Sequence, residues 1–507
     1  MTTAANPTLE QIQDFKGPYP RQLWWLFFSE MWERFSFYGM RGVLTFFMVN
    51  QLIMDEKVAN LQYGATQAFV YAFTFVGGLF ADKILGFRRS LFWGGFLMIV
   101  GSLILAVNPK DFFFWGIAFN IVGTGFFKPN ISTMVGTLYK DGDERRDAGF
   151  SLFYSGINVG AFLGGYICVA LGKSESLGAY SWNACFAMVA LVMTISVVTF
   201  GFSQKYLGPI GHTPRAGDVA SGATGPRQLV WQDYATFAGS LAIIPVLRTM
   251  VARTEYTDYF MYTIGPLTLL YIGYEMTKYS SAERKKLMAA LVFVIFSIVF
   301  WAFFEQSGGS LSLFAANNLR AWELGPVKVD PNGVNNAANS IFVIIFAPLL
   351  GIVWVWLAAR KKEPNTVVKF GLGFLFLAGA FFVFAATKFF AGPDGITSLG
   401  LFTLAYFVIT FGELCLSPIG LSIMTKLSPK PLQGVMMGMW FLASAYGQYA
   451  AGLLGAGMTS PAKDATALDK LNSYTAGYQQ LAIYAVVAGV LLIVISPMVR
   501  KLMGDVK

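Results

Sequence analysis

Charged and aromatic residues are closely spaced in one apolar stretch near the start of the chain, which reads EMWERFSFYGMR. An α-helix places two carboxylates, two guanidinium groups and two aromatic rings within about 140° of arc, namely Glu30, Glu33, Arg34, Phe37, Tyr38 and Arg41. Each carboxylate on this face can exchange a proton for an ion pair with the neighbouring arginine. The alternative is an internal salt-bridge network that only fixes the helix, although apolar packing would do so at lower cost.

A second candidate is a lysine within another apolar stretch. Asn120, Thr124 and Lys128 are spaced four residues apart, and Pro129 follows. A lysine in apolar surroundings either has a charged partner or extends to the end of its span. The apolar stretch continues to about residue 138, so the pattern favours a functional position over extension to the surface.

Two further acids are isolated in apolar sequence. Glu413 shares a helical face with Ser417, and Pro418 favours a bend at that point. Glu305 lies in the run WAFFEQSGG. The single histidine, His212, lies in a hydrophilic connector, so any proton transfer within the apolar segments would have to use carboxylates. Other polar residues in apolar stretches are more often contacts between helices: Tyr154, Asn158, Asn339, Trp440 and Ser444.

The composition identifies the elements that must position these residues. Of 507 residues, 55% are hydrophobic and 13% are charged, and the mean hydropathy is +0.55. Soluble domains contain about 25% charged residues, so this is a polytopic membrane protein. The net charge of +9 comes from basic residues in short loops, which indicate topology rather than nucleic-acid binding. The three cysteines lie in apolar segments, and the spacing predicts neither a disulfide nor a metal site.

A membrane span needs about 20 apolar residues, and fourteen candidates are present. They are 23–52, 61–82, 89–107, 112–138, 148–172, 180–203, 231–252, 256–277, 284–315, 338–359, 366–389, 397–425, 430–457 and 475–499. An even number puts both termini on one side of the membrane. The basic runs at 83–89, 145–146, 284–286 and 360–362 fall on that side, so we expect both termini in the cytoplasm and a multi-pass protein of the inner (plasma) membrane. The polar N-terminus predicts no cleavable signal peptide.

Five motifs, in order along the chain, resemble those of the proton-coupled oligopeptide transporters (POT) of the major facilitator superfamily. The run from Glu30 to Gly39 is similar to the family pattern E-x-x-E-R-F-x-Y-Y-G, with Phe37 in place of the first tyrosine. The others are 77–89 (GGLFADKILGFRR), 150–162 (FSLFYSGINVGAF), the Phe-Lys-Pro-Asn run at Lys128, and the run from Glu413 to Pro418. The resemblance covers essentially the whole chain.

The resemblance implies an all-α membrane protein with two six-helix bundles around a central cavity and a two-helix insertion, fourteen transmembrane helices in all. The implied parts are a cytoplasmic N-terminal tail 1–22, an N-terminal bundle 23–203, a cytoplasmic connector 204–230, an insertion 231–280, a C-terminal bundle 281–503 and a cytoplasmic tail 504–507. Opposite charges on equivalent helices of the two bundles suit alternating access, because pairs can form on one side and break when it opens.

The implied function is proton-driven uptake of di- and tripeptides. By the resemblance, Arg34 and Lys128 would bind the peptide carboxylate and Glu413 its ammonium group, while Arg41 and Glu305 would form the outward gate. The implied proton-coupling residues are Glu30, Glu33, Arg34, Glu305 and Glu413. The implied substrate-binding residues are Arg34, Phe37, Tyr38, Arg41, Tyr71, Lys128, Tyr154, Asn158, Asn339, Glu413, Ser417, Trp440, Phe441 and Ser444.

Three other functions are less well supported. A proton-coupled carrier of another small anion, such as nitrate, could use the same fold, but such relatives tend to lack the complete E-x-x-E-R pattern. An enzyme is not expected, because His212 is the single histidine and lies in the connector, and the sequence shows neither a nucleophile–histidine pair nor a metal-ligand cluster. A channel would not need a clamp of opposite charges. We expect a monomer in the lipid bilayer, with protons as the coupling ion and no cofactor.

Overall fold

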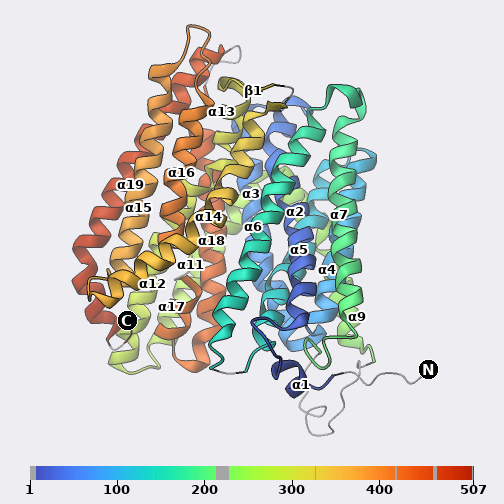
Figure 1. Cartoon of the computed structure of the whole chain (residues 1–507), viewed down its shortest axis with the longest axis vertical. Helices are drawn as coiled ribbons and strands as arrows, with labels where there is room; N and C mark the ends of the chain where they lie inside the picture. Colours follow the sequence, from blue (N-terminus) through green and yellow to red (C-terminus); the bar gives the residue numbers. More distant parts are fainter. Residues whose placement is uncertain are drawn as a thin grey trace. The chain divides into compact units, whose positions relative to one another are not determined.

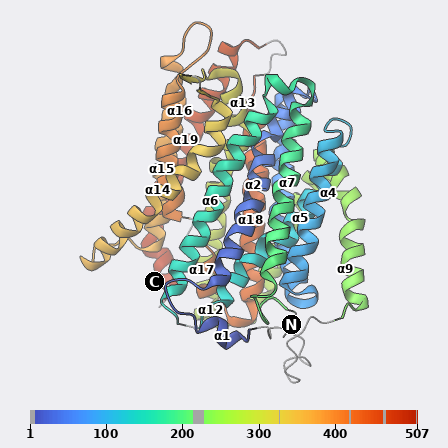
Figure 2. The same cartoon turned by 45° about the vertical axis from the view of Figure 1, so that its right-hand side comes forward.

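The computed structural model describes residues 7–140, 142–212, 228–325, 327–416, 420–460, 465–504 and 506. These residues form long α-helices and one short hairpin (Figures 1 and 2). In the described residues, each of the fourteen expected spans coincides with a helix or with consecutive helices. Ten helices in the described part of the chain are long and apolar enough to cross a membrane. The long helices α2 (Arg21–Asn50), α5 (Phe113–Thr137), α11 (Thr254–Met276) and α18 (Gln433–Gly457) are not among the ten.

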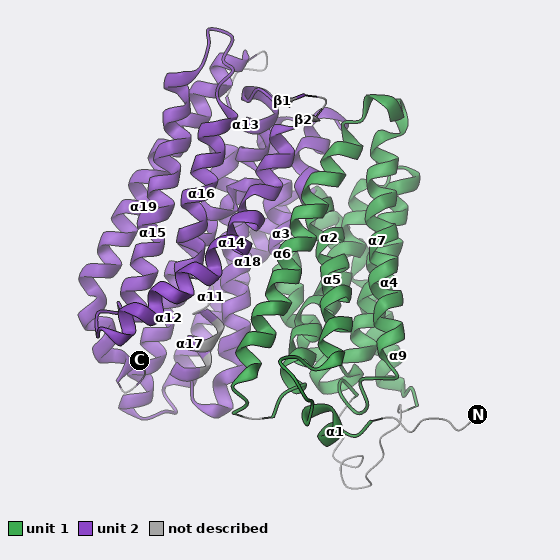
Figure 3. Ribbon diagram, viewed as in Figure 1, with its two compact units in different colours: residues 1–41, 69–252 green, residues 42–68, 253–507 purple. Residues whose placement is uncertain are grey.

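The chain divides into two compact units, coloured separately in Figure 3. Unit 1 comprises residues 1–41 and 69–252, and unit 2 comprises residues 42–68 and 253–507. Helices α2 and α3 (Glu56–Phe80) therefore contribute one end to each unit. The domain boundaries expected from the sequence remain a prediction.

Unit 1 contains the remaining N-terminal helices. They are α1 (Leu9–Gln13), α4 (Phe87–Val107), α5, α6 (Arg145–Gly172), α7 (Ser181–Ser203), α9 (Trp231–Ala242) and α10 (Ile244–Ala252), with a π-helical turn at Ala81–Leu85 and a 3₁₀ turn at Glu175–Tyr180. Helix α9 lies beside α4 in both views (Figures 1 and 2). Arg89 on α4 pairs with the buried Asp233 at 3.2 Å, and the Trp93 Nε1 donates to the Ser240 Oγ at 2.9 Å. The first insertion helix is thus attached to unit 1.

Small residues let the helices of unit 1 approach one another closely. A Cβ atom at Gly160 of α6 would overlap the carbonyl oxygen of Met31 on α2, and one at Gly164 would overlap that of Phe35. This four-residue spacing of glycines is typical of helix contacts in membranes. It brings the backbone of α6 directly against the segment of α2 that carries the charged face.

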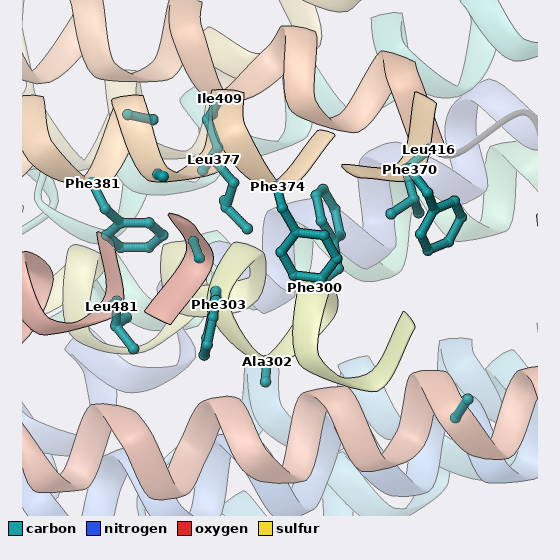
Figure 4. Close-up of a cluster of buried hydrophobic side chains, with 14 of the residues drawn as sticks. Phe300, Ala302, Phe303, Phe370, Phe374, Leu377, Phe381, Ile409, Leu416 and Leu481 are labelled. Carbon is teal, nitrogen blue, oxygen red and sulfur yellow. The ribbon is translucent and has the colours of Figure 1, made fainter. Parts of the chain in front are cut away.

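Unit 2 has a core of phenylalanine and leucine side chains. Its helices are α11, α12 (Ser281–Phe304), α13 (Ser310–Asn318), α14 (Pro331–Ala359), α15 (Thr366–Ala386), α16 (Leu399–Leu416), α17 (Gly420–Leu427), α18 and α19 (Ala467–Met503), with 3₁₀ turns at Glu305–Gly308, Thr387–Phe390 and Lys430–Leu432. Figure 4 shows Phe300 and Phe303 of α12 with Phe374 and Phe381 of α15 in this core. The aromatic rings pack edge to face, as at Phe300 and Phe374, whose centroids are 5.5 Å apart.

The ends of α2 and α3 within unit 2 are fixed by polar contacts. Glu56 at the start of α3 accepts from the Lys470 Nζ and the Tyr474 Oη, each at 2.6 Å, and from the Asn317 Nδ2 at 3.1 Å. Thr45 on α2 donates to the carbonyl of Gly308. These bonds hold residues 42–68 against α13 and α19.

A short antiparallel hairpin joins α13 to α14. Strand β1 (Trp322–Leu324) pairs with β2 (Val327–Val329), and Trp322 lies opposite Val329. The sequence analysis did not predict this hairpin, because three-residue strands give too short a pattern to recognise.

Candidate functional site

Arg34 is held between two carboxylates on α2. Its Nε lies 3.2 Å from the Glu30 Oε1, its Nη2 donates to the Glu33 Oε1 at 2.5 Å, and Nε also contacts the Glu33 Oε2. The arginine is 2% exposed and both acids are buried. The helical-face prediction for these three residues is confirmed by their contacts. Charges this deep in an apolar protein have a high desolvation cost, which favours paired or functional groups.

Gly160 positions this cluster from the neighbouring helix. A Cβ atom at Gly160 would lie 3.0 Å from the Arg34 Cβ, so a larger residue there would push α6 away from the arginine. Asn158, two residues earlier on α6, is buried, and its Nδ2 donates to the Tyr154 carbonyl at 3.0 Å. Tyr154 itself is exposed.

Lys128 is surrounded by aromatic rings rather than by a carboxylate of its own helix. Its Nζ lies 4.2 Å from the centroid of Tyr71 on α3 and 5.9 Å from that of Phe37 on α2. The Arg34 Cζ lies 5.0 Å from the same Phe37 ring. A ring face attracts cations, so Phe37 brings two positive groups toward one place without neutralising either. This pairing of cations suits the binding of an anion.

Helix α5 presents Lys128 through a close contact with α3. A Cβ atom at Gly77 of α3 would overlap the carbonyl of Gly125 on α5, one turn before Lys128. Pro129 has no backbone N–H, so the helix lacks one hydrogen bond next to the lysine. Arg41, farther along α2, lies with its Cζ 5.7 Å from the Tyr38 ring.

Asn120 and Thr124 do not join Lys128 in this cluster. The Asn120 Nδ2 donates to the Gly116 carbonyl at 2.9 Å, and the Thr124 Oγ1 lies 3.7 Å from the Met98 Sδ on α4. Both residues are buried where α4 and α5 pack together. Their position on the helix was predicted, but they contribute to packing.

In unit 2, Glu413 is oriented by Asn339. The Asn339 Nδ2 donates to the Glu413 Oε2 at 2.9 Å and to the Thr410 Oγ1 at 3.2 Å. Glu413 and Asn339 are both half-buried. The sequence analysis missed Thr410, although it lies on the face of α16 that carries Glu413, one turn earlier.

Helix α14 carries more asparagines than the one predicted. Asn332, Asn335, Asn336 and Asn339 recur every three or four residues and form a polar stripe. The Asn335 Oδ1 accepts from the Tyr406 Oη at 2.6 Å, while the Asn332 Nδ2 donates to the Ser312 carbonyl at 2.7 Å. The stripe was visible in the sequence and fixes α14 against α13 and α16.

Trp440 and Ser444 lie one turn apart on α18, and both are buried. A Cβ atom at Gly420 of α17 would overlap the Trp440 ring, so this glycine makes room for the indole. Phe441 is half-buried. Ser417, predicted on the same face as Glu413, lies outside the described residues.

Glu305 marks a break in a helix. Helix α12 ends at Phe304, a 3₁₀ turn runs from Glu305 to Gly308, and α13 continues from Ser310. Glu305 is buried. The neighbouring Gln306 supports the break, since its Nε2 donates to the carbonyls of Ala302 and Ala451 at 3.1 and 3.0 Å. Interrupted helices are typical of transporter binding sites.

Sequence comparisons identify the family. The family model described as the POT family matches residues 88–471. The peptide transporter YePEPT of Yersinia enterocolitica is 33% identical over 514 residues, covering 97% of this chain and 96% of that protein. Dipeptide and tripeptide permease A of Escherichia coli is 27% identical over 507 residues, covering 100% and 98%.

The chain belongs to the POT family.

Solved structures of POT transporters have the same fold. A complex of peptide transporter POT with sulfate has a TM-score of 0.80 at 30% identity, covering 98% of this chain and 99% of that one. A POT family transporter in complex with 5-aminolevulinic acid has a TM-score of 0.78 at 28% identity, covering 97% and 100%. The major facilitator fold predicted from the sequence is therefore confirmed. The protein is a multi-pass membrane transporter and not an enzyme.

Proposed function

We propose that this POT transporter takes up di- and tripeptides by proton-driven symport with alternating access. The observation that carries the proposal is the pairing of Arg34 and Lys128 around the Phe37 ring of unit 1, together with the carboxylate of Glu413 oriented by Asn339 in unit 2. A peptide is a zwitterion whose two ends need partners of opposite charge.

In this proposal Arg34 and Lys128 bind the peptide carboxylate, and Glu413 binds the ammonium group. Asn158 and Asn339 bond the peptide backbone, while Arg41 and Glu305 close the outward side. The remaining predicted substrate contacts are Phe37, Tyr38, Tyr71, Tyr154, Ser417, Trp440, Phe441 and Ser444.

Relatives support this substrate class. Those reported above are named as a peptide transporter and as a dipeptide and tripeptide permease. One structural neighbour was solved with alafosfalin, at 31% identity and a TM-score of 0.79. The complete E-x-x-E-R pattern at Glu30, Glu33 and Arg34 favours peptides over nitrate.

Proton coupling follows from competition for Arg34. When a peptide carboxylate binds Arg34, a glutamate loses its cationic partner and can take up a proton instead. Among the described residues, no donor reaches the Glu30 Oε2, so this oxygen is already short of partners. Each proton that moves inward gains about 2.3 kcal/mol per 100 mV of membrane potential, in addition to the pH gradient.

The proposal extends to the setting of the protein. We place it in the inner (plasma) membrane with both termini in the cytoplasm, functional as a monomer, with protons as the coupling ion and no cofactor. The concentration of lysine and arginine in alternate loops supports this orientation.

The direct test is uptake of labelled dialanine by proteoliposomes. We expect accumulation with an inward proton gradient and only equilibration without one. Free alanine should compete poorly, because it cannot reach both charged groups at once. Gradient-independent accumulation would refute proton coupling, and competition by alanine as strong as that by dialanine would refute the two-ended site.

A further inference from the structure

An apolar groove opens on the surface of unit 2. It is a cavity of about 400 Å³ between α11, α12 and α18. Leu291, Ile295 and Ile298 of α12 line it together with Tyr262 and Leu269 of α11 and Tyr446 of α18. Ile295 is 57% exposed, Tyr262 66% and Leu269 54%, so the groove is open to the hydrocarbon of the bilayer.

Helix α11 is held across this groove by two tyrosines of α18. The Tyr449 Oη donates to the Asp258 Oδ1 at 2.5 Å, and the Tyr446 Oη donates to the carbonyl of Met261. Gly265 makes room for the Tyr446 ring, because a Cβ atom at that position would overlap its hydroxyl. The tyrosines keep the helices attached while the space between them remains open.

Positive charge lies at one end of the same groove. Arg284 and Lys285 are exposed at the start of α12, where the Arg284 Nε donates to the Tyr279 carbonyl at 2.9 Å. Lys278, which follows the end of α11, is paired with Glu275 at 2.7 Å. At 100° per residue, Arg284 falls within about 40° of Leu291, Ile295 and Ile298 on the helix surface. The arginine and the apolar lining therefore form one stripe along α12.

The dimensions of this stripe match one leaflet of a membrane. The groove residues on α12 follow Arg284 by 7 to 14 positions, or roughly 10–21 Å at 1.5 Å per residue. One leaflet contributes about 15 Å of hydrocarbon, half the thickness of the core. A phosphate at Arg284 would thus place its acyl chain in the groove.

The geometry points to a binding site for an anionic phospholipid, with the headgroup at Arg284 and Lys285 and one acyl chain between α11, α12 and α18. The positive charges of Arg284 and Lys285 favour a lipid with an anionic headgroup. The exposed apolar lining of the groove favours contact with an acyl chain. Because α18 also carries Trp440 and Ser444, the bound lipid would contact a helix that contributes predicted peptide-binding residues. The site does not depend on which substrate is transported.

Native mass spectrometry of the purified full chain tests this site. The probes are phosphatidylglycerol, phosphatidylcholine with the same acyl chains, and glycerol phosphate, which has the headgroup chemistry but no chain. We expect retention of one phosphatidylglycerol in preference to phosphatidylcholine, with no competition from glycerol phosphate. Equal retention of the two lipids would refute the charged end of the site, and displacement by glycerol phosphate would refute the groove.

Two variants separate the two ends of the site. Leu269→Trp with Ile295→Trp fills the groove and should abolish retention, whereas Ile352→Trp with Val487→Trp, on exposed faces of α14 and α19, should not. Arg284→Gln with Lys285→Gln should lower retention of phosphatidylglycerol by about tenfold. The matched change at the basic run Arg360 and Lys361 should have no such effect. Unchanged lipid retention in Leu269→Trp with Ile295→Trp, or in Arg284→Gln with Lys285→Gln, would overturn the proposal. Arg284 and Lys285 are exposed, so the glutamine variant tests the proposal even if the tryptophan variant does not fold.

Discussion

Arg34 has two buried carboxylate partners on its own helix. In the proposed mechanism, substrate binding and protonation therefore use the same group. Glu33 makes the closer contact, through both of its oxygens, while the Glu30 Oε1 lies 3.2 Å from the Arg34 Nε. A peptide carboxylate at Arg34 would replace one of these partners. In the proposed mechanism, one acid would stay paired with the arginine while the other carries the proton.

Substituting Glu33→Gln should abolish proton-driven accumulation of peptide without abolishing peptide binding. Glutamine imitates the protonated acid, so we expect loss of gradient-driven accumulation but preserved exchange of labelled for unlabelled peptide across the membrane. The measurement is uptake and counterflow in the same proteoliposomes. Arg34→Ala is the control and should damage both activities. Accumulation by Glu33→Gln at a rate close to wild type would show that this acid is not required for coupling.

His212 should play no part in the pH dependence of transport. Burial and the neighbouring Arg88 and Arg89 lower its pKa from 6.5 to about 4. His212→Gln should therefore leave the profile of uptake unchanged between about pH 5.5 and 8. A shifted profile would contradict this. The unfolded histidine binds a proton more readily, so wild type should lose stability relative to the variant as pH falls from about 6.5 to 4, measured by thermal unfolding.

At the scale of single residues, the sequence predicted the contacts within one helix better than those between helices. Helical periodicity was enough to place Glu30, Glu33 and Arg34 together, because Glu30 lies one turn before the adjacent Glu33 and Arg34 on α2. It also grouped Asn120 and Thr124 with Lys128, although both pack against α4. Periodicity states which residues share a face, but the partner opposite that face depends on tertiary packing.

At the scale of elements, long apolar spans were predictable and short irregular ones were not. Hydropathy over some 20 residues is a strong signal, which is why every expected span coincides with helical structure. The interruption of one span at Glu305 involves only four residues, and each strand of the hairpin β1–β2 has only three. Such features depend on side chains elsewhere, as at Gln306, whose amide bonds the carbonyl of Ala451 on α18.

The contact between α2 and α6 depends on the small size of Gly160. Gly160→Val should force the helices apart beside Arg34, at a cost of about 1–3 kcal/mol, and should weaken peptide binding. Gly201→Val is the matched control, because nothing lies within 4 Å of a Cβ atom at that position on α7. Thermal unfolding and peptide affinity are the measurements. Equal behaviour of the two variants would mean that the close approach at Gly160 is not needed.

At the scale of the whole molecule, the insertion does not form a body of its own. Helices α9 and α10 belong to unit 1, where Asp233 and Ser240 bond α4, whereas α11 belongs to unit 2, where Asp258 bonds Tyr449. The chain crosses from one unit to the other between Ala252 and Arg253. The insertion therefore contributes α9 and α10 to unit 1 and α11 to unit 2. Composition and hydropathy could not indicate this division.

Replacing residues 231–280 by a flexible linker should leave peptide binding within a few-fold of wild type, because the segment contains none of the predicted proton or substrate residues. The same protein should lose its retained phosphatidylglycerol, since α11 forms one wall of the groove. Peptide affinity and native mass spectrometry on one monodisperse preparation give both results. Complete loss of peptide binding in a folded protein would show that the insertion supports the site itself. If the lipid were still retained at full level, α11 would not be part of its binding site, and the groove would have to be rejected as the place where the acyl chain lies.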